Sequence, residues 1–237
     1  IPALLQRFGG KRQWYGRETP RHPVMVKAFQ IARVPVTNAQ YALYVADQNV
    51  KPPEHWRGGQ PPRGEESHPV VYVSWHDAQA YCRWLSGKIG KTVRLPTESE
   101  WEKAARGARD PREYPWGDDW SELKCNSYEL GLQSTSPVGF FTSGASPYGC
   151  LDMAGNVWEW TNSLWGKDSG KPQFAYPYKP DDGRENLSAG NDVRRVLRGG
   201  AWYGTQYNVR CASRNRYIPD HWNDDVGFRV VLSLAEF

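Results

Sequence analysis

The 237-residue sequence lacks several features that would assign it to particular classes of protein. It has no apolar stretch long enough to cross a bilayer, so we expect no membrane span. Its four cysteines form no CxxC pair, and no cysteine–histidine cluster has the spacing of a zinc site. The 30 Lys and Arg residues only slightly outnumber the 26 Asp and Glu residues. Because these charges are spread along the chain without a basic stripe, we expect no nucleic-acid partner.

Aromatic and chain-breaking residues are abundant instead. The sequence contains 12 Trp, 13 Tyr, 23 Gly and 18 Pro. Frequent Gly and Pro interrupt periodic segments, which predicts a loop-rich α+β fold. Buried Trp and Tyr need polar partners, so we expect a core with many side-chain hydrogen bonds. No linker or shift of composition divides the chain, which predicts one domain over residues 1–237.

A few segments carry clear signals of secondary structure. Thr37, Ser74 and Thr97 have N-cap chemistry, and Glu100 completes a capping box with Thr97. These caps precede helical patterns over residues 39–47, 75–86 and 98–106, the second ending before Gly87. Short apolar runs predict strands within residues 25–35 and over residues 70–73, 193–197 and 228–232. The sequence therefore predicts two to three helices and short mixed or antiparallel sheets.

Eight short motifs occur in one order along almost the whole chain. They are Val36–Tyr41, Pro69–Trp75, Arg94–Glu102, Tyr114–Gly117, Ser136–Gly139, Tyr148–Trp160, Arg198–Trp202 and Gly227–Val231. Together they resemble the sulfatase-modifying-factor family, whose founding member is the formylglycine-generating enzyme. The resemblance implies the C-type lectin fold of the formylglycine-generating-enzyme type. A fold does not by itself fix a function.

The chemistry of that family's enzymes has no counterpart among the residues here. Those enzymes oxidise a substrate cysteine with a pair of active-site cysteines that hold copper, and copper(I) prefers thiolate ligands. Carried over by the resemblance, Gly204 stands near the place of the first cysteine. No cysteine follows before Cys211, which matches a neighbouring structural position. We therefore expect that this chain is not an enzyme of that kind and has no catalytic residues.

The segment of about residues 202–226 has a second resemblance, to the variable region of proteins diversified by retroelements. In those systems adenines of a template rich in Asn codons are miscopied, and the altered copy rewrites the end of a target gene. Residues at the plausible positions are all reachable from an Asn codon, whereas Gln206 and Trp222 are not. Tyr, Ser, Gly and Asn are also typical of binding loops, and Trp is a frequent hot-spot residue. The predicted ligand-binding residues are Tyr203, Gly204, Thr205, Tyr207, Asn208, Ser213, Asn215, Tyr217, Ile218, His221, Trp222, Asn223, Asp224 and Asp225.

The resemblance to the enzyme family also implies structural calcium. The first predicted site uses the side chains of Asp152 and Glu159 with the carbonyls of Gly155 and Val157. The second uses Asn126, the carbonyl of Ser127 and Glu129. Carboxylate and carbonyl oxygens suit calcium, and an ion there would order loops rather than catalyse a reaction.

Three hypotheses for function follow. The leading one is a non-enzymatic variable protein that binds a protein or other macromolecule through residues 203–225. The alternative is an oxidase or accessory enzyme of the formylglycine-generating type with altered chemistry. A third is a structural or signalling module in which this fold serves only as a scaffold.

Overall fold

The computed structural model describes residues 1–108 and 111–234, and the described part contains five α-helices and seven short strands. The helices are α1 (Pro2–Phe8), α2 (Arg12–Gly16), α3 (Asn38–Gln48), α4 (Trp75–Ile89) and α5 (Glu98–Arg106). The strands are β1 (Phe29–Ile31), β2 (Val93–Arg94), β3 (Trp158–Gly166), β4 (Arg194–Arg198), β5 (Asn215–Tyr217), β6 (Val226–Gly227) and β7 (Val231–Ser233). Among these residues no helix has the length and apolar character needed to traverse a bilayer, as expected.

The three predicted helices are confirmed, and each begins at the predicted cap. Thr37, Ser74 and Thr97 each accept a hydrogen bond from the backbone N–H three residues later, in a complete capping box. The predicted end of α4 was wrong: the helix continues through Gly87 to Ile89 and stops at Gly90, which has φ +68°. A left-handed C-cap requires a residue that tolerates positive φ, and glycine at position 90 meets this requirement.

Two further helices, α1 and α2, were not predicted. Neither has a side-chain cap, and α1 contains no buried residue, so the sequence carries little local signal for them. The predicted strand over residues 70–73 was also wrong. The three valines are buried and Tyr72 is half-buried, and the Val36 carbonyl accepts the Val70 N–H, but these residues join no ladder. Buried apolar residues satisfy the pattern of a strand without pairing as one.

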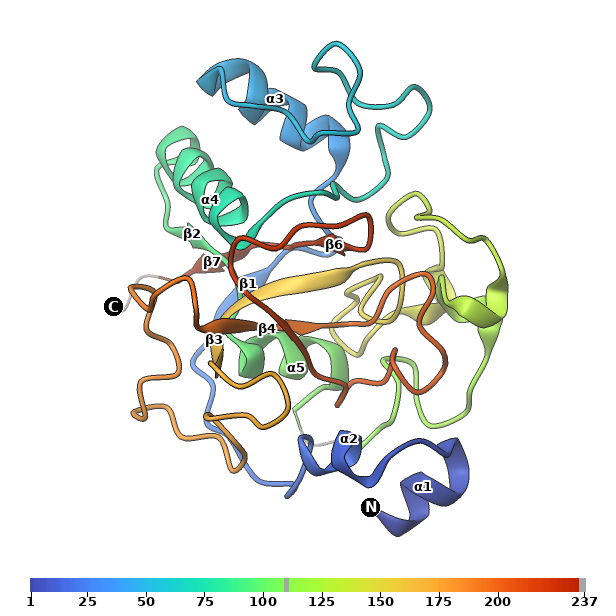
Figure 1. Cartoon of the computed structure of the whole chain (residues 1–237). Coiled ribbons are helices and arrows are strands. Elements are labelled where there is room, and N and C mark those ends of the chain that lie inside the picture. Colours follow the sequence, from blue (N-terminus) through green and yellow to red (C-terminus); the bar gives the residue numbers. More distant parts are fainter. Residues whose placement is uncertain (109–110, 235–237) are drawn as a thin grey trace.

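The strands form two small sheets. One is antiparallel in the order β1-β7-β2, and the other is mixed in the order β5-β4-β3-β6, with β6 parallel to β3. α4 lies beside the first sheet, α5 lies against β3 and β4, and α1 and α2 lie at the opposite end of the molecule from α3 (Figure 1). The predicted strand over residues 228–232 is confirmed only at its end, where β7 begins at Val231; residues 228–230 belong to no strand. The predicted α+β, loop-rich class with short mixed and antiparallel sheets is confirmed.

The core is rich in aromatic side chains, and several of them are hydrogen-bonded within the protein. The indoles of Trp75 and Trp160 donate to the carbonyls of Thr161 and Val73, at 3.0 Å each. The indole of Trp101 donates to the Glu159 carboxylate at 2.8 Å. These bonds cross-link strand β3 to distant segments, so the core is held by directional contacts as well as by apolar burial.

Candidate functional site

The segment of residues 202–226 crosses the four-stranded sheet from one edge to the other. β5 forms one edge and pairs with β4, with Tyr217 opposite Arg195. The loop of residues 218–225 then leads to β6 on the far edge, where Val226 lies beside Trp158 of β3. Because both ends of this loop are fixed in the same sheet, its side chains are presented on a stable frame.

One group of predicted residues gathers around the Asp225 carboxylate. The Tyr203 hydroxyl donates to Asp225 Oδ2 at 2.6 Å, and the Trp158 N–H donates to the Asp225 carbonyl at 2.8 Å. Tyr217 stacks on His221 with ring centroids 3.8 Å apart. Asp225 is fully buried, and its other carboxylate oxygen has no hydrogen-bond partner in the described part of the chain. Burial raises the pKa of Asp225 and lowers that of His221.

A second group forms around Trp222, which is 43% exposed. Its ring lies 5.8 Å from that of Tyr72, which in turn lies 4.7 Å from the His55 ring. The Tyr72 N–H donates to the Asn223 carbonyl at 2.9 Å, and Tyr72 has φ +58°. Tyr72 and His55 were missed by the sequence argument, because they lie 150 or more residues from Trp222 in the chain and nothing local indicates that contact.

The remaining predicted residues divide between frame and surface. Tyr207 stacks on Trp14 and lies 4.5 Å from the Arg210 guanidinium, and buried Ser213 donates to the Tyr207 carbonyl at 2.8 Å. These contacts hold Tyr207 against α2, and Ser213 is bonded to the Tyr207 backbone. The predicted residues with exposed side chains are Tyr203, Thr205, Ile218, Trp222 and Asn223, and those half-buried are Tyr207, Asn208, Asn215, Tyr217, His221 and Asp224.

Gly204, at the place of the first enzyme cysteine, is closely surrounded. Its N–H donates to the Ala201 carbonyl at 2.7 Å, and its own carbonyl accepts the Tyr128 N–H at 3.0 Å. A Cβ here would lie 3.0 Å from the Ala201 oxygen and 3.1 Å from Asn208 Cβ. A side chain at this position therefore requires its neighbours to shift. Tyr128, 67% exposed beside Gly204, is another surface aromatic that the sequence argument missed.

The cysteines offer no thiolate pair. Cys82, Cys125, Cys150 and Cys211 are all free and buried. Burial raises the thiol pKa of Cys82, Cys125 and Cys211 to about 12. Such thiols stay protonated at neutral pH and are poor nucleophiles and metal ligands.

The first predicted calcium site does not fit an ion well. Both oxygens of Glu159 already bind the Arg229 guanidinium, each at 2.7 Å, and the Trp101 indole shares one of them. A calcium ion would have to displace or sit beside this cation, which costs Coulomb energy. Asp152 accepts the Gly139 N–H through one oxygen, and burial raises its pKa to about 6.

The second predicted calcium site fits better. The Asn126 side-chain oxygen is buried and has no hydrogen-bond partner among the residues that the structure describes. Ser127 is fully buried beside it, and one Glu129 oxygen accepts the Gln206 N–H at 2.8 Å. An unpaired buried carbonyl oxygen is suited to a hard cation. Within residues 1–108 and 111–234, no cluster of three or more His, Cys, Asp or Glu side chains could hold a metal ion.

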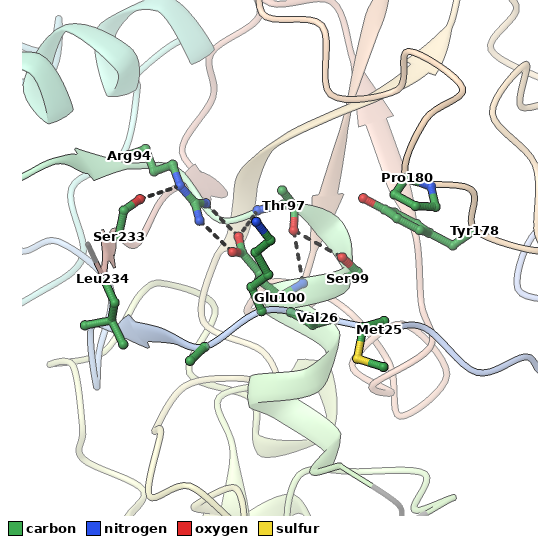
Figure 2. Close-up of a pocket in the computed structure, with 12 residues that line it drawn as sticks. Met25, Val26, Arg94, Thr97, Ser99, Glu100, Tyr178, Pro180, Ser233 and Leu234 are labelled. Atoms are coloured by element: carbon green, nitrogen blue, oxygen red, sulfur yellow. Dashed lines mark hydrogen bonds and ion pairs between the residues drawn. The ribbon is translucent and has the colours of Figure 1, made fainter. Parts of the chain in front are cut away.

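Two cavities lie elsewhere, and neither is lined by a predicted ligand-binding residue. A cavity of about 300 Å³ lies at the start of α5, where Arg94 forms a two-pronged ion pair with Glu100 at 2.6 and 2.7 Å (Figure 2). Arg94 also donates to the Ser233 hydroxyl, so Arg94 and Glu100 are already paired within the protein. A cavity of about 850 Å³ separates residues 18–26 from the end of α5.

The comparisons with known proteins agree on one family. The chain matches the family described as "Sulfatase-modifying factor enzyme 1-like domain" over residues 5–234. It is 33% identical to "Formylglycine-generating enzyme" of Streptomyces coelicolor, over 90% of this chain and 80% of that protein. It is 32% identical to "Inactive C-alpha-formylglycine-generating enzyme 2" of Mus musculus, over 92% and 79%. It is also 32% identical to "Serine/threonine-protein kinase pkn1" of Chlamydia caviae, of which it spans only 36%.

Solved structures give the same fold. PvdO from Pseudomonas aeruginosa superposes with a TM-score of 0.71 at 30% identity, over 92% of this chain and 86% of that one. Treponema denticola variable protein 1 superposes with a TM-score of 0.67 at 24% identity, over 86% and 84%. The second likeness concerns the fold alone. The predicted C-type lectin fold of the formylglycine-generating-enzyme type is thus confirmed.

Proposed function

Because the chain belongs to the sulfatase-modifying factor enzyme 1-like family, we propose that it is a non-enzymatic member that binds a macromolecular ligand. The binding surface is the one formed by the exposed residues among 203–225. Diversification of this surface by a retroelement is part of the proposal. The likeness of fold to a protein named as variable is compatible with it.

The observation that carries the proposal is the environment of Gly204. The position has no thiol, its backbone is bonded on both sides, and even a Cβ would be crowded. All four cysteines are buried. Two-thiolate copper chemistry therefore has no ligands on this face.

The shape of the surface supports a large ligand rather than a small substrate. Small-molecule sites are usually concave, whereas the predicted ligand-binding residues line neither of the two cavities described above. Tyr203, Ile218 and Trp222 are instead exposed by 43%, 41% and 43%. Exposed aromatic side chains on a fixed frame are typical of protein-binding surfaces.

The relatives' names do not decide between binding and catalysis. The chain is about equally similar to a protein named as an enzyme and to one named as inactive. The deciding test is to incubate the protein with copper and a cysteine-bearing sulfatase peptide. We expect no formylglycine by mass spectrometry, with the Streptomyces coelicolor enzyme as positive control. Formylglycine formed by this chain would establish the enzymatic alternative.

The diversification is tested by the gene's surroundings. We expect a reverse-transcriptase gene and a near-repeat of the 3′ end that differs from it only at adenines. Absence of both would refute diversification and leave a ligand-binding member of fixed sequence.

Structural calcium remains a part of the proposal only at the second site. Asn126 would hold the ion through its unpaired side-chain oxygen, Ser127 through its carbonyl, and Glu129 through its carboxylate. When bound, the ion would order the loop that supports Gly204 through Tyr128.

A further inference from the structure

Asp225 differs from three buried glutamates of this chain in lacking a cationic partner. Glu18 pairs with Arg210 at 2.7 Å, Glu98 with Arg214 at 2.6 Å, and Glu159 with Arg229 at 2.7 Å. Asp225 is as deeply buried, yet no Lys or Arg in the described part of the chain pairs with it. Its hydrogen bond comes from the Tyr203 hydroxyl, and its Oδ1 is unbonded. A buried charge of this kind is costly when nothing neutralises it.

The groups around Asp225 add no positive charge. Residues 217–226 contain three Asp and no Lys or Arg. The nearby His221 is disposed to be neutral, because burial lowers its pKa. Arg216, just before this stretch, donates to the Ser169 carbonyl and lies over the Trp165 ring. The loop is therefore locally acidic, although the whole chain has a net charge of +4.

Two exposed aromatic rings belong to the segment of residues 202–226 that carries this charge. Tyr203 and Trp222 are each 43% exposed, and Tyr203 is joined to the carboxylate by its hydroxyl. Aromatic faces attract Lys and Arg side chains. A phenol that donates to a carboxylate presents a more electron-rich ring, which strengthens that attraction. We call Tyr203, Tyr217, Ile218, Trp222, Asp224 and Asp225 the acidic aromatic face.

We propose that the acidic aromatic face binds a basic segment of a partner protein, with Lys or Arg side chains over the exposed rings of Tyr203 and Trp222. The partner's cation neutralises the charge that Asp225 and Asp224 leave uncompensated. This inference rests on the proposed function and adds to it the chemistry of the ligand. The charge complementarity favours a basic protein segment over an acidic or purely apolar one.

The test is selection of a phage-displayed library of random peptides on the immobilised full chain at low ionic strength. We expect the recovered peptides to be enriched in Lys and Arg and to bind more weakly as salt is added. Synthetic versions should bind about tenfold more weakly to Asp225→Asn, which removes the charge but preserves the shape. Asp181→Asn, which removes an exposed carboxylate from another loop, is the matched control and should leave binding unchanged.

The outcomes separate this inference from the function on which it rests. One outcome is that the recovered peptides lose binding to the double variant Tyr203→Ala/Trp222→Ala and yet lack basic residues, or bind Asp225→Asn as well as the wild type. Such peptides would refute a basic partner segment and still support binding at this surface. If no peptide depends on Tyr203 and Trp222, both proposals fail. Asp225→Asn should fold at least as stably as the wild type, so its loss of binding would not arise from unfolding.

Discussion

Arg229 and Glu159 form a two-pronged ion pair in which both side chains are fully buried. Arg229 Nε lies 2.7 Å from Glu159 Oε2, and Nη2 lies 2.7 Å from Oε1. The same arginine donates to the carbonyls of Leu151 and Asp152. This pair joins two of the motifs on which the family resemblance rests, Tyr148–Trp160 and Gly227–Val231.

Removing one member of this pair should destabilise the fold strongly. Glu159→Gln leaves a buried guanidinium without a counter-charge, so we expect a loss of about 3–5 kcal/mol in the free energy of unfolding. Urea titration monitored by Trp fluorescence measures it. The double variant Glu159→Gln/Arg229→Met should recover part of the loss. As a control, Asp192→Asn removes an exposed partner of Lys167 and should change stability little. Equal losses in the free energy of unfolding for Glu159→Gln and Asp192→Asn would refute this account.

Adding a methyl group at Gly155 should destabilise the fold far more than adding one at Gly131. Both have positive φ, +75° and +80°, so both alanine variants carry backbone strain of about 1 kcal/mol. A Cβ at Gly155 would also lie 2.0 Å from the Asn126 carbonyl oxygen, whereas Gly131 has open space. Thermal unfolding should therefore show a much larger loss for Gly155→Ala. Similar melting temperatures for the two alanine variants would mean that the backbone at Gly155 is not in close contact with the Asn126 carbonyl.

The capping box of α5 should contribute measurably to the free energy of unfolding. Thr97→Ala removes the acceptor of the Glu100 N–H, and we expect a loss of about 1 kcal/mol in urea unfolding. Ser188→Ala, an exposed loop substitution, is the control and should have almost no effect. Helical circular dichroism should remain near that of the wild type, because tertiary packing still holds the helix.

Asp225 should make stability depend on pH in a defined direction. Burial raises its pKa in the folded protein, so its ionisation opposes folding at neutral pH. The opposition disappears as pH falls through the folded pKa towards the ordinary aspartate value of 3.8. Asp225→Asn should thus be more stable than the wild type at pH 7, and the difference should vanish near pH 4. The titratable groups facing Asp225 are Tyr72, Tyr203, Tyr217, His221 and Asp224, and none of them is substituted in the variant. A stability difference between Asp225→Asn and the wild type that stays constant with pH would refute the raised pKa of Asp225.

Chelation should report on the second calcium site. If Asn126 holds calcium, EGTA should lower the melting temperature, and added calcium should restore it. Asn126→Ala should remove this sensitivity, whereas Asp152→Asn should retain it. A melting temperature that is unchanged over a range of chelator concentrations would exclude the ion.

The sequence alone determined the features that arise from local chemistry. The starts of α3, α4 and α5 follow from Thr37, Ser74 and Thr97, because each cap bonds a backbone group only three residues away. The motif Gly227–Val231 likewise indicates the family from sequence, without knowledge that its Arg229 pairs with Glu159. The absence of a thiol pair near Gly204 could also be read directly from the chain.

Only the tertiary structure decided which predicted residues share a surface. Strand β3 is buried along its whole length and has no alternating pattern, so local periodicity did not reveal it. Tyr207 packs on Trp14 of α2, whereas Trp222 contacts Tyr72 from a remote loop. Asp225 could not be recognised as an unpaired buried charge from sequence, because pairing depends on which arginines the fold brings near. Burial and charge compensation are set by contacts between segments far apart in the chain, and one-dimensional patterns do not contain those contacts.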